Sequence, residues 1–470
     1  MALALCFSAN ATLSVKYPCS DGMVLQQLTD ALVWGHADPG AAVQVVTSWN
    51  KAKYNVKAGA DGVFKAYVAT PAASSEAYSI RVSSGKEKYE ISDVLIGEVW
   101  IAGGQSNMEM PIRGFFNCPV EGASEVIAAA PNNNVRMFTV KIFTSYEPVA
   151  DVQETDGWQS AGPESVSEMS AAAYFFARQL NQTLGIPVGI VAIPRGGSRV
   201  ESWLPRATME SYGTEDCSPE GQQKRVEWAR SCIMYNGMEQ PVCGYTAKGF
   251  IWYQGCSNVG KAGEFVPRMV DMVRQWRSDW GDKDAKMPFY QVEIAPFQYG
   301  GGQFELAPAL RAAQHESASV IPNCAIICTN DLAYPYEKHN IHPCQKLQVG
   351  QRLAYLALNR EYGLKKLQCY SPEAVEITGG EGELIVKLSN CSNGLDRLAG
   401  IEGLEIAGED GVFHPVTSVV FDWQKDTMHL KCDEVASPVK ARYGWADFKP
   451  GNLHSSEGLP VVPFDLSLPR

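Results

Sequence analysis

The chain has 470 residues, of which 45% are hydrophobic and 20% charged, and its formal net charge is −12 at pH 7. That length favours two or three domains. The composition is typical of a soluble globular protein, and the negative charge argues against nucleic acid or an anionic membrane as the main partner. The sequence contains no apolar run of the roughly 18–20 residues that a membrane-spanning helix needs.

The first eleven residues, MALALCFSANA, are mostly apolar and end in a small-x-small pattern. They lack a basic segment and are short for a complete secretory signal. We interpret them as the end of an export signal, which predicts a periplasmic or extracellular protein. The alternative is an ordinary chain terminus.

The thirteen cysteines include no Cys-x-x-Cys pair, and no cysteine–histidine cluster has the spacing of a zinc finger. Cys217, Cys232 and Cys243 lie in a loop-rich stretch. They are the candidates for a disulfide if the protein is exported.

Residues 12–92 predict an N-terminal β-sandwich, because short apolar runs of strand character alternate with turns such as Pro39-Gly40. From residue 366 to residue 470, strand-like runs joined by glycine turns predict a second β-rich module.

Between these modules, residues 93–365 predict an α/β domain. Glycine turns follow several apolar runs, and residues at helical spacing form apolar faces between them. We expect strands near 94–104, 186–197, 248–255, 288–296 and 324–331, and helices near 173–184, 265–276 and 344–363. This alternation implies a mostly parallel sheet with helices on both faces.

Ligands of such sheets bind beyond the carboxyl ends of the strands. Four predicted strand ends carry polar residues: Gly103-Gly104-Gln105-Ser106-Asn107, Arg195-Gly196-Gly197-Ser198, Gln254-Gly255-Cys256-Ser257-Asn258, and the segment 329–343 with Asp331, His339 and His342. A serine nucleophile requires a base and donors for an oxyanion. Ser106 fits the nucleophile, either histidine fits the base, and the glycine turns offer free amides. One such turn alone is commonplace, but four at the strand ends of one domain favour a catalytic site.

The same segments resemble the sialate O-acetylesterase family of SGNH (GDSL-like) hydrolases. The matching blocks are SDGMVLQQ (20–27), GGQSNMEM (103–110), PRGGSRVESW (194–203), YNGM (235–238), GFIWYQGCSN (249–258), NIHP (340–343) and GNLHSSEGLPVVPF (451–464). They span nearly the whole chain in order. The resemblance implies an SGNH-type parallel sheet flanked by helices.

The resemblance further implies that Ser106 is the nucleophile and His342 the general base. Oxyanion donors would be the Ser106 and Gly197 amides and Asn258, with Gln254 nearby. The implied reaction removes acetyl groups from the hydroxyls of an O-acetylated carbohydrate through an acyl-enzyme, without a metal or other cofactor.

Two departures from the family pattern concern the acidic residues. The family usually has Glu where this chain has Cys256, which favours a small packing residue over a thiol nucleophile. SGNH enzymes commonly place Asp three residues before the catalytic histidine, and that residue is His339 here. Asn340 stands where many relatives have Asp. Asp331, Glu337, a backbone carbonyl or no group at all remains to orient His342, and we include Asp331 in the predicted catalytic set.

Substrate contacts and the function itself keep alternatives open. Arg195 and Arg199 would attract a carboxylated sugar such as sialic acid. The alternative, which is the more common case for an arginine, is a side chain that lies in solvent and contacts no substrate. Trp203, Trp252 and Tyr253 fit either a sugar-stacking surface or the core. The leading hypothesis is a carbohydrate O-acetylesterase acting on sialic acid or related glycans. The alternatives are an inactive glycan-binding protein on the same scaffold and an acetylxylan-type esterase.

Overall fold

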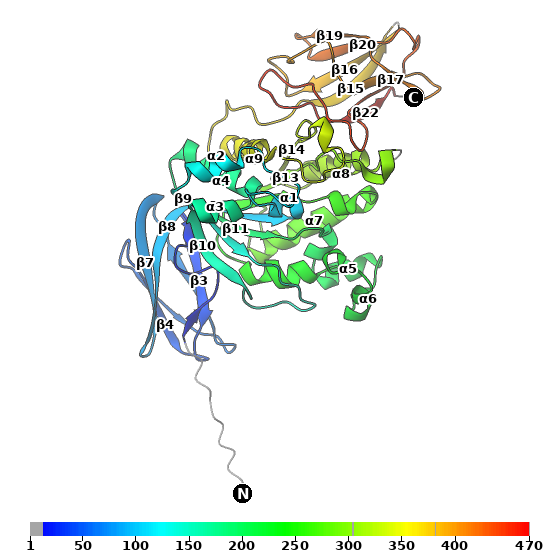
Figure 1. The fold of residues 1–470 in the computed structure, drawn as a ribbon. Coiled ribbons are helices and arrows are strands. Elements are labelled where there is room, and N and C mark those ends of the chain that lie inside the picture. Colours follow the sequence, from blue (N-terminus) through cyan, green and yellow to red (C-terminus); the bar gives the residue numbers. More distant parts are fainter. Residues whose placement is uncertain (1–12, 303–304, 381, 470) are drawn as a thin grey trace.

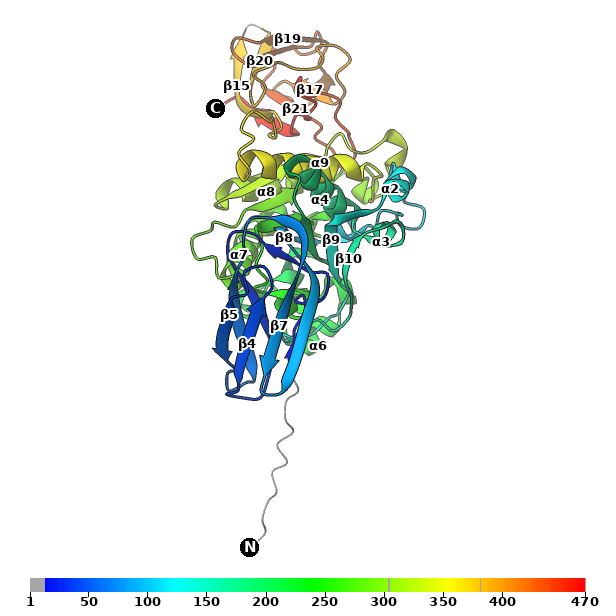
Figure 2. The same cartoon turned by 90° about the vertical axis from the view of Figure 1, so that its left-hand side faces the viewer.

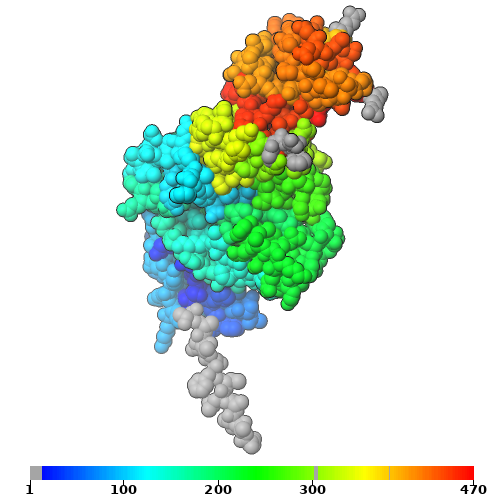
Figure 3. Space-filling model, turned by 45° about the vertical axis from the view of Figure 1, so that its right-hand side comes forward, coloured from blue at the N-terminus to red at the C-terminus, as the bar shows by residue number. Residues whose placement is uncertain are grey.

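The computed structural model describes residues 13–302, 305–380 and 382–469. The predicted export signal lies outside these residues. Along the chain follow a β-rich N-terminal part, a central α/β body and a C-terminal β module (Figure 1). The space-filling view shows the C-terminal module as a separate lobe on one end of the body (Figure 3).

The N-terminal strands form two layers. One is a three-stranded sheet in the order β1-β3-β6. The other contains β4, β5, β7 and the start of β8 (Figure 2). The bounds are β1 Ser14–Val15, β2 Val24–Gln26, β3 Asp30–His36, β4 Ala42–Thr47, β5 Lys53–Lys57, β6 Val63–Ala69, β7 Ser74–Ser84 and β8 Glu87–Gly104. In β6, alternate residues such as Phe64 and Ala66 are buried, as the period of a one-sided sheet requires.

Strand β8 joins the N-terminal part to the body without a break. Its first half pairs antiparallel with β7, and its second half lies between β11 and β12 of the central sheet. The predicted boundary between residues 92 and 93 therefore falls inside one 18-residue strand.

The central sheet has the order β10-β9-β11-β8-β12-β13-β14. All neighbours are parallel except β9 and β10, which pair antiparallel. The bounds are β9 Asn132–Val140, β10 Thr155–Ala161, β11 Val188–Pro194, β12 Gly249–Tyr253, β13 Phe289–Val292 and β14 Cys324–Ile327. The five strands predicted from the sequence all lie in this sheet, so the mixed α/β class is confirmed.

Helices cover both faces of this sheet. Successive residues of β8 point to opposite faces: Ile101 packs in a core with α7 and α8, whereas Trp100 and Ala102 pack in a core with α4 and α9. The bounds are α1 Ser106–Glu109, α2 Ala123–Ala129, α3 Pro163–Glu168, α4 Ala171–Leu184, α5 Arg206–Tyr212, α6 Pro219–Gln223, α7 Ala262–Asp279, α8 Leu306–Val320 and α9 Lys346–Arg360. The three predicted helices correspond to α4, α7 and α9.

The C-terminal module consists of two four-stranded antiparallel sheets, β15-β16-β20-β19 and β18-β17-β21-β22. The bounds are β15 Glu373–Gly380, β16 Glu383–Ser389, β17 Leu404–Ala407, β18 Phe413–Pro415, β19 Ser418–Asp422, β20 Thr427–Lys431, β21 Lys440–Tyr443 and β22 Phe464–Ser467. The module contacts the body through the Arg311 guanidinium, which donates to the Ala446 carbonyl, and through an ion pair between Arg442 and Glu305.

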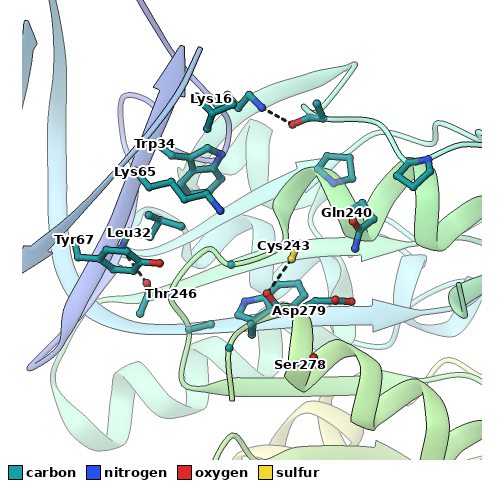
Figure 4. Close-up of a pocket in the computed structure, with 18 of the residues that line it drawn as sticks. Lys16, Leu32, Trp34, Lys65, Tyr67, Gln240, Cys243, Thr246, Ser278 and Asp279 are labelled. Carbon is teal, nitrogen blue, oxygen red and sulfur yellow. Dashed lines mark hydrogen bonds between the residues drawn. The ribbon is translucent and has the colours of Figure 1, made fainter. Parts of the chain in front are cut away.

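A cavity of about 670 Å³ lies between the N-terminal part and the body (Figure 4). Trp34 and Lys65 line one side, and Cys243 and Asp279 line the other. The segments around Cys243 and Asp279 precede β12 and β13. This cavity therefore lies at the amino ends of the parallel strands, opposite the edge that carries Ser106.

The twelve described cysteines are all free, so Cys217, Cys232 and Cys243, the disulfide candidates in an exported protein, are unbonded in this structure. In the described part of the chain, no helix is both long and apolar enough to cross a bilayer.

Candidate active site

Ser106 is the first residue of α1, and only Gln105 separates it from the end of β8. The turn between them depends on Gly104, which has φ +136° and lies against β12. A side chain at that position would overlap the Tyr253 carbonyl. The glycine therefore lets the chain leave the sheet sharply and present Ser106 at its carboxyl edge.

His342 reaches Ser106 from the segment that follows β14. Its Nε2 lies 2.8 Å from Ser106 Oγ, which is hydrogen-bond distance. His339 is exposed. Of the two histidines left open by the sequence, the structure therefore brings His342 to the serine.

Asn340 and Phe115 hold His342 in place. The Asn340 amide accepts the His342 backbone N–H at 2.9 Å and donates to the His342 carbonyl at 3.0 Å. The Phe115 ring packs edge-on against the imidazole, with 5.1 Å between centroids. Cys118 Sγ lies 3.9 Å from Nδ1 and donates to Asn340 Oδ1. The histidine is thus positioned by an amide, a ring and a thiol.

Asp331 does not orient His342 in this structure. Its carboxylate accepts two hydrogen bonds from Arg352, at 2.7 and 2.6 Å, and one from His454 Nε2 at 3.1 Å. Although burial opposes it, these bonds lower the pKa of Asp331 to about 2. Asp331 therefore joins α9 to the C-terminal module, which corrects the expectation that it acts on His342.

Glu337, the other candidate acid, is also committed elsewhere. Its two carboxylate oxygens accept the backbone N–H groups of Tyr334 and Cys344. The dyad of Ser106 and His342 therefore has no carboxylate contact from either acid that the sequence offered.

The backbone amides of Ser106 and of the adjacent loop at Gly197 are the candidate oxyanion donors. Within the described residues, the N–H groups of Ser106 and Gly197 have no hydrogen-bond acceptor. Gly197 has φ +75°, and a Cβ there would lie 2.5 Å from Trp228 Cδ1. The neighbouring Gly196 N–H donates to the Glu109 carboxylate, which fixes this loop beside the serine. The arrangement fits a pair of oxyanion donors.

Asn258 and Gln254 hold the same loop from the end of β12. Asn258 Nδ2 donates to Glu201 at 2.9 Å, and its Oδ1 accepts the Val200 N–H at 3.1 Å. Gln254 Nε2 donates to Asn258 Oδ1 and to the Ser198 carbonyl. The bonds of Asn258 in this structure therefore go to the loop and to Gln254, and its role as an oxyanion donor stays a prediction.

The two arginines of this loop differ. Arg199 is buried in ion pairs with Glu201 and Glu215, so it is a structural residue. Arg195 lies 3.7 Å from Glu227, and its buried Nε has no partner within the described residues. The Arg195 side chain is 17% exposed, against 6% for Arg199, so Arg195 is the arginine that a ligand can reach.

The aromatic and thiol candidates belong to the core. Trp203, Trp252 and Tyr253 are no more than 1% exposed, so the sugar-stacking alternative is wrong for them. Cys256 is also buried, and burial raises the pKa of its thiol. A protonated, enclosed thiol is a packing residue rather than a nucleophile.

Glu109 and Lys346 are site residues that the sequence did not single out. Glu109 lies three positions after Ser106 and lines a cavity of about 370 Å³ together with Phe115, Arg113 and Lys141. Two residues three positions apart in a helix lie on the same side of it, so this spacing could have predicted that Glu109 lies beside Ser106. Lys346 donates to Asn107, which follows the serine. In the described part of the chain, no group of three or more His, Cys, Asp or Glu side chains is placed to hold a metal ion.

Residues 96–359 match the family described as carbohydrate esterase, sialic acid-specific acetylesterase. The chain belongs to this family of carbohydrate esterases. The esterase is 26% identical to the sialate O-acetylesterase of Mus musculus, over 94% of this chain and 92% of the mouse protein. The sialate O-acetylesterase of Homo sapiens is also 26% identical, over 95% of this chain and 91% of the human protein.

A solved structure agrees over most of the length of the esterase. The carbohydrate acetylesterase of Xanthomonas citri is 31% identical, covers 97% of this chain and 100% of its own, and superposes with a TM-score of 0.85. These similarities identify the protein as an enzyme that hydrolyses carboxylic esters of carbohydrates.

Burial, together with the charge of Lys346, lowers the pKa of His342 to about 4. Only neutral imidazole can accept the serine proton, so kcat/KM is expected to rise with pH through about 4 and to reach its plateau well below the ordinary histidine pKa. A pH profile with a soluble acetyl ester checks this. An acidic limb at the ordinary histidine value would contradict the buried, cation-flanked environment.

Proposed function

We propose that the enzyme removes O-acetyl groups from sialic acid or a related glycan, using Ser106 and His342 on an SGNH-type parallel sheet. The observation that carries the proposal is the 2.8 Å contact between Ser106 Oγ and His342 Nε2 beside two free backbone N–H groups. The relatives named for sialate O-acetylesterase activity support the substrate class.

The reaction has two halves. His342 Nε2 takes the Ser106 hydroxyl proton while Oγ attacks the acetyl carbonyl carbon, and the Ser106 and Gly197 amides stabilise the resulting oxyanion. The intermediate collapses, and the departing sugar oxygen takes the proton from His342. Water then attacks the acetyl-serine with His342 as base, which releases acetate and restores Ser106.

Arg195 supports an acidic sugar, and the cavity lined by Glu109 and Phe115, which contact the Gly196 amide and the His342 ring, supports a site for the sugar ring. The Arg195 side chain follows β11 in the loop of Gly197 and keeps an exposed part, where a sugar carboxylate would replace Glu227 as its partner. The cavity of about 370 Å³ at Glu109 and Phe115 lies in the size range of small-ligand sites. The acetyl group would lie at Ser106 and the sugar ring in this cavity.

The substrate class is tested by acetate release from O-acetylated N-acetylneuraminic acid, from acetylated xylan and from 4-nitrophenyl acetate. We expect the sialic acid to give the highest kcat/KM. Arg195→Met should lower that value about tenfold or more, since a charged hydrogen bond is lost, while 4-nitrophenyl acetate hydrolysis stays near the wild-type rate.

Other outcomes select the alternatives. A preference for acetylated xylan that Arg195→Met does not change would make the protein an acetylxylan-type esterase. Saturable glycan binding without any acetate release would make it a binding protein.

We also propose that the protein is exported, on the composition of its first eleven residues alone. Fractionation of cells that express the full chain tests this. Retention of the whole product in the cytoplasm would contradict it.

A further inference from the structure

Lys346, the first residue of α9, is a buried cation behind the catalytic pair. Its side chain is 1% exposed in the described fold. Nζ donates to Asn107 Oδ1 at 2.9 Å and to the Pro343 carbonyl at 2.6 Å, and it lies 6.0 Å from the centroid of the Tyr253 ring. Neither hydrogen-bond acceptor is a carboxylate. Glu337 is the nearby opposite charge, but its carboxylate accepts two backbone N–H groups and no bond from Lys346. Burying an ammonium group that is not directly paired is costly, so the position calls for an explanation.

The partners of Lys346 come from both halves of the dyad. Asn107 directly follows Ser106, and its Nδ2 donates to the Ile341 carbonyl at 3.0 Å. Pro343 directly follows His342. Three hydrogen bonds therefore connect helix α1, which carries the nucleophile, with the loop that carries the base.

We propose that Lys346 is a positioning residue of the Ser106–His342 dyad, whose buried ammonium holds helix α1 and the loop 341–343 together through Asn107 and Pro343. The inference rests on the proposed serine–histidine mechanism. It assigns to a lysine, acting on both loops at once, the alignment that neither Asp331 nor Glu337 supplies.

The charge of Lys346 has a second effect on the site. The groups that face it are Glu337, Cys344, Cys256 and Cys118, besides the Tyr253 ring. Burial lowers the pKa of Lys346 to about 8, against the attraction of Glu337. Lys346 is thus charged at neutral and mildly acidic pH. At those pH values the charge of Lys346 is the second cause, after burial, of the lowered pKa of His342.

The test compares Lys346→Met with Lys366→Met. The second variant removes an exposed lysine from the segment that follows α9 and is the matched control. The measurements are the pH profile of kcat/KM for 4-nitrophenyl acetate and the NMR titration of the His342 ring. A third variant, Asn107→Ala, breaks the same connection but keeps the positive charge.

For Lys346→Met we expect kcat/KM to fall about 10- to 100-fold, because small misplacements of reacting groups cost that much. We also expect the acidic limb and the His342 titration to move up from about 4, while burial keeps them below the ordinary value of 6.5. Asn107→Ala should lower the rate without moving the limb. Lys366→Met should match the wild type in both.

The outcomes separate this inference from the proposed function. If Lys346→Met keeps its rate and its acidic limb, or only melts earlier, Lys346 is not a positioning residue. If Lys346→Met does not fold, Asn107→Ala decides, and an unchanged rate in that variant overturns the inference. If Ser106→Ala itself stays active, the proposed mechanism fails instead.

Discussion

Replacing Ser106 with alanine is expected to lower kcat for acetyl-ester hydrolysis by about 10⁴- to 10⁶-fold, because no acyl-enzyme can form without its oxygen. His342→Ala should lose about as much, and the double variant little more, since the two residues act as one unit. Steady-state kinetics on 4-nitrophenyl acetate and on O-acetylated sialic acid measure this.

A matched control is Ser211→Ala, which removes an exposed hydroxyl that bonds only within α5. It should behave as the wild type. Substantial activity in Ser106→Ala would show that another residue is the nucleophile, and the free N–H groups beside Ser106 would then need a different explanation.

Replacing Asp331 with alanine is expected to affect stability far more than chemistry. Arg352 would be left buried without its counter-charge, which typically costs about 3–5 kcal/mol of unfolding free energy. The bond from His454 to the body would also be lost. Because the carboxylate does not contact His342, the folded variant should keep kcat within about tenfold of the wild type.

Urea denaturation and kinetics below the unfolding transition separate these two effects. Asp284→Ala, which removes an exposed carboxylate paired with Lys286, is the control and should unfold at the same urea concentration as the wild type, because an exposed ion pair contributes little to stability. A stable Asp331→Ala variant with the activity of His342→Ala would restore Asp331 to the catalytic set.

Five of the seven strands in the order of the central sheet were predictable as apolar runs between helical segments, and the runs of β8, β11 and β12 lead into glycine turns such as Gly103-Gly104. Strands β9 and β10 were missed. Helix α8 was missed. Its buried residues include three alanines and the polar Arg311, Gln314 and Ser317, so they form no clear apolar stripe. Pro308 lies in its first turn, where proline is tolerated although it usually indicates the end of a helix. The predicted boundary at residue 92 falls inside β8. One continuous strand passes from the N-terminal part into the central sheet, so no turn residue marks where the body begins.

Within the site, Ser106 and His342 were accessible from motifs at strand ends, but their surroundings were not. Lys346 and Asn107 are 239 positions apart, so a lysine that begins a helix gives no sign of being buried against the nucleophile. Asp331 lies near the predicted base in sequence, which made it the natural acid. Only the fold shows that Arg352 and His454 hold its carboxylate.

The central claim is that Ser106, activated by His342, is the nucleophile of this carbohydrate esterase. Its most direct test is reaction with a fluorophosphonate, followed by mass spectrometry of the labelled peptides. The account predicts one label per chain on Ser106, no label in Ser106→Ala and much slower labelling in His342→Ala. Labelling at another residue that persists in Ser106→Ala, or no labelling of an active enzyme, would contradict it.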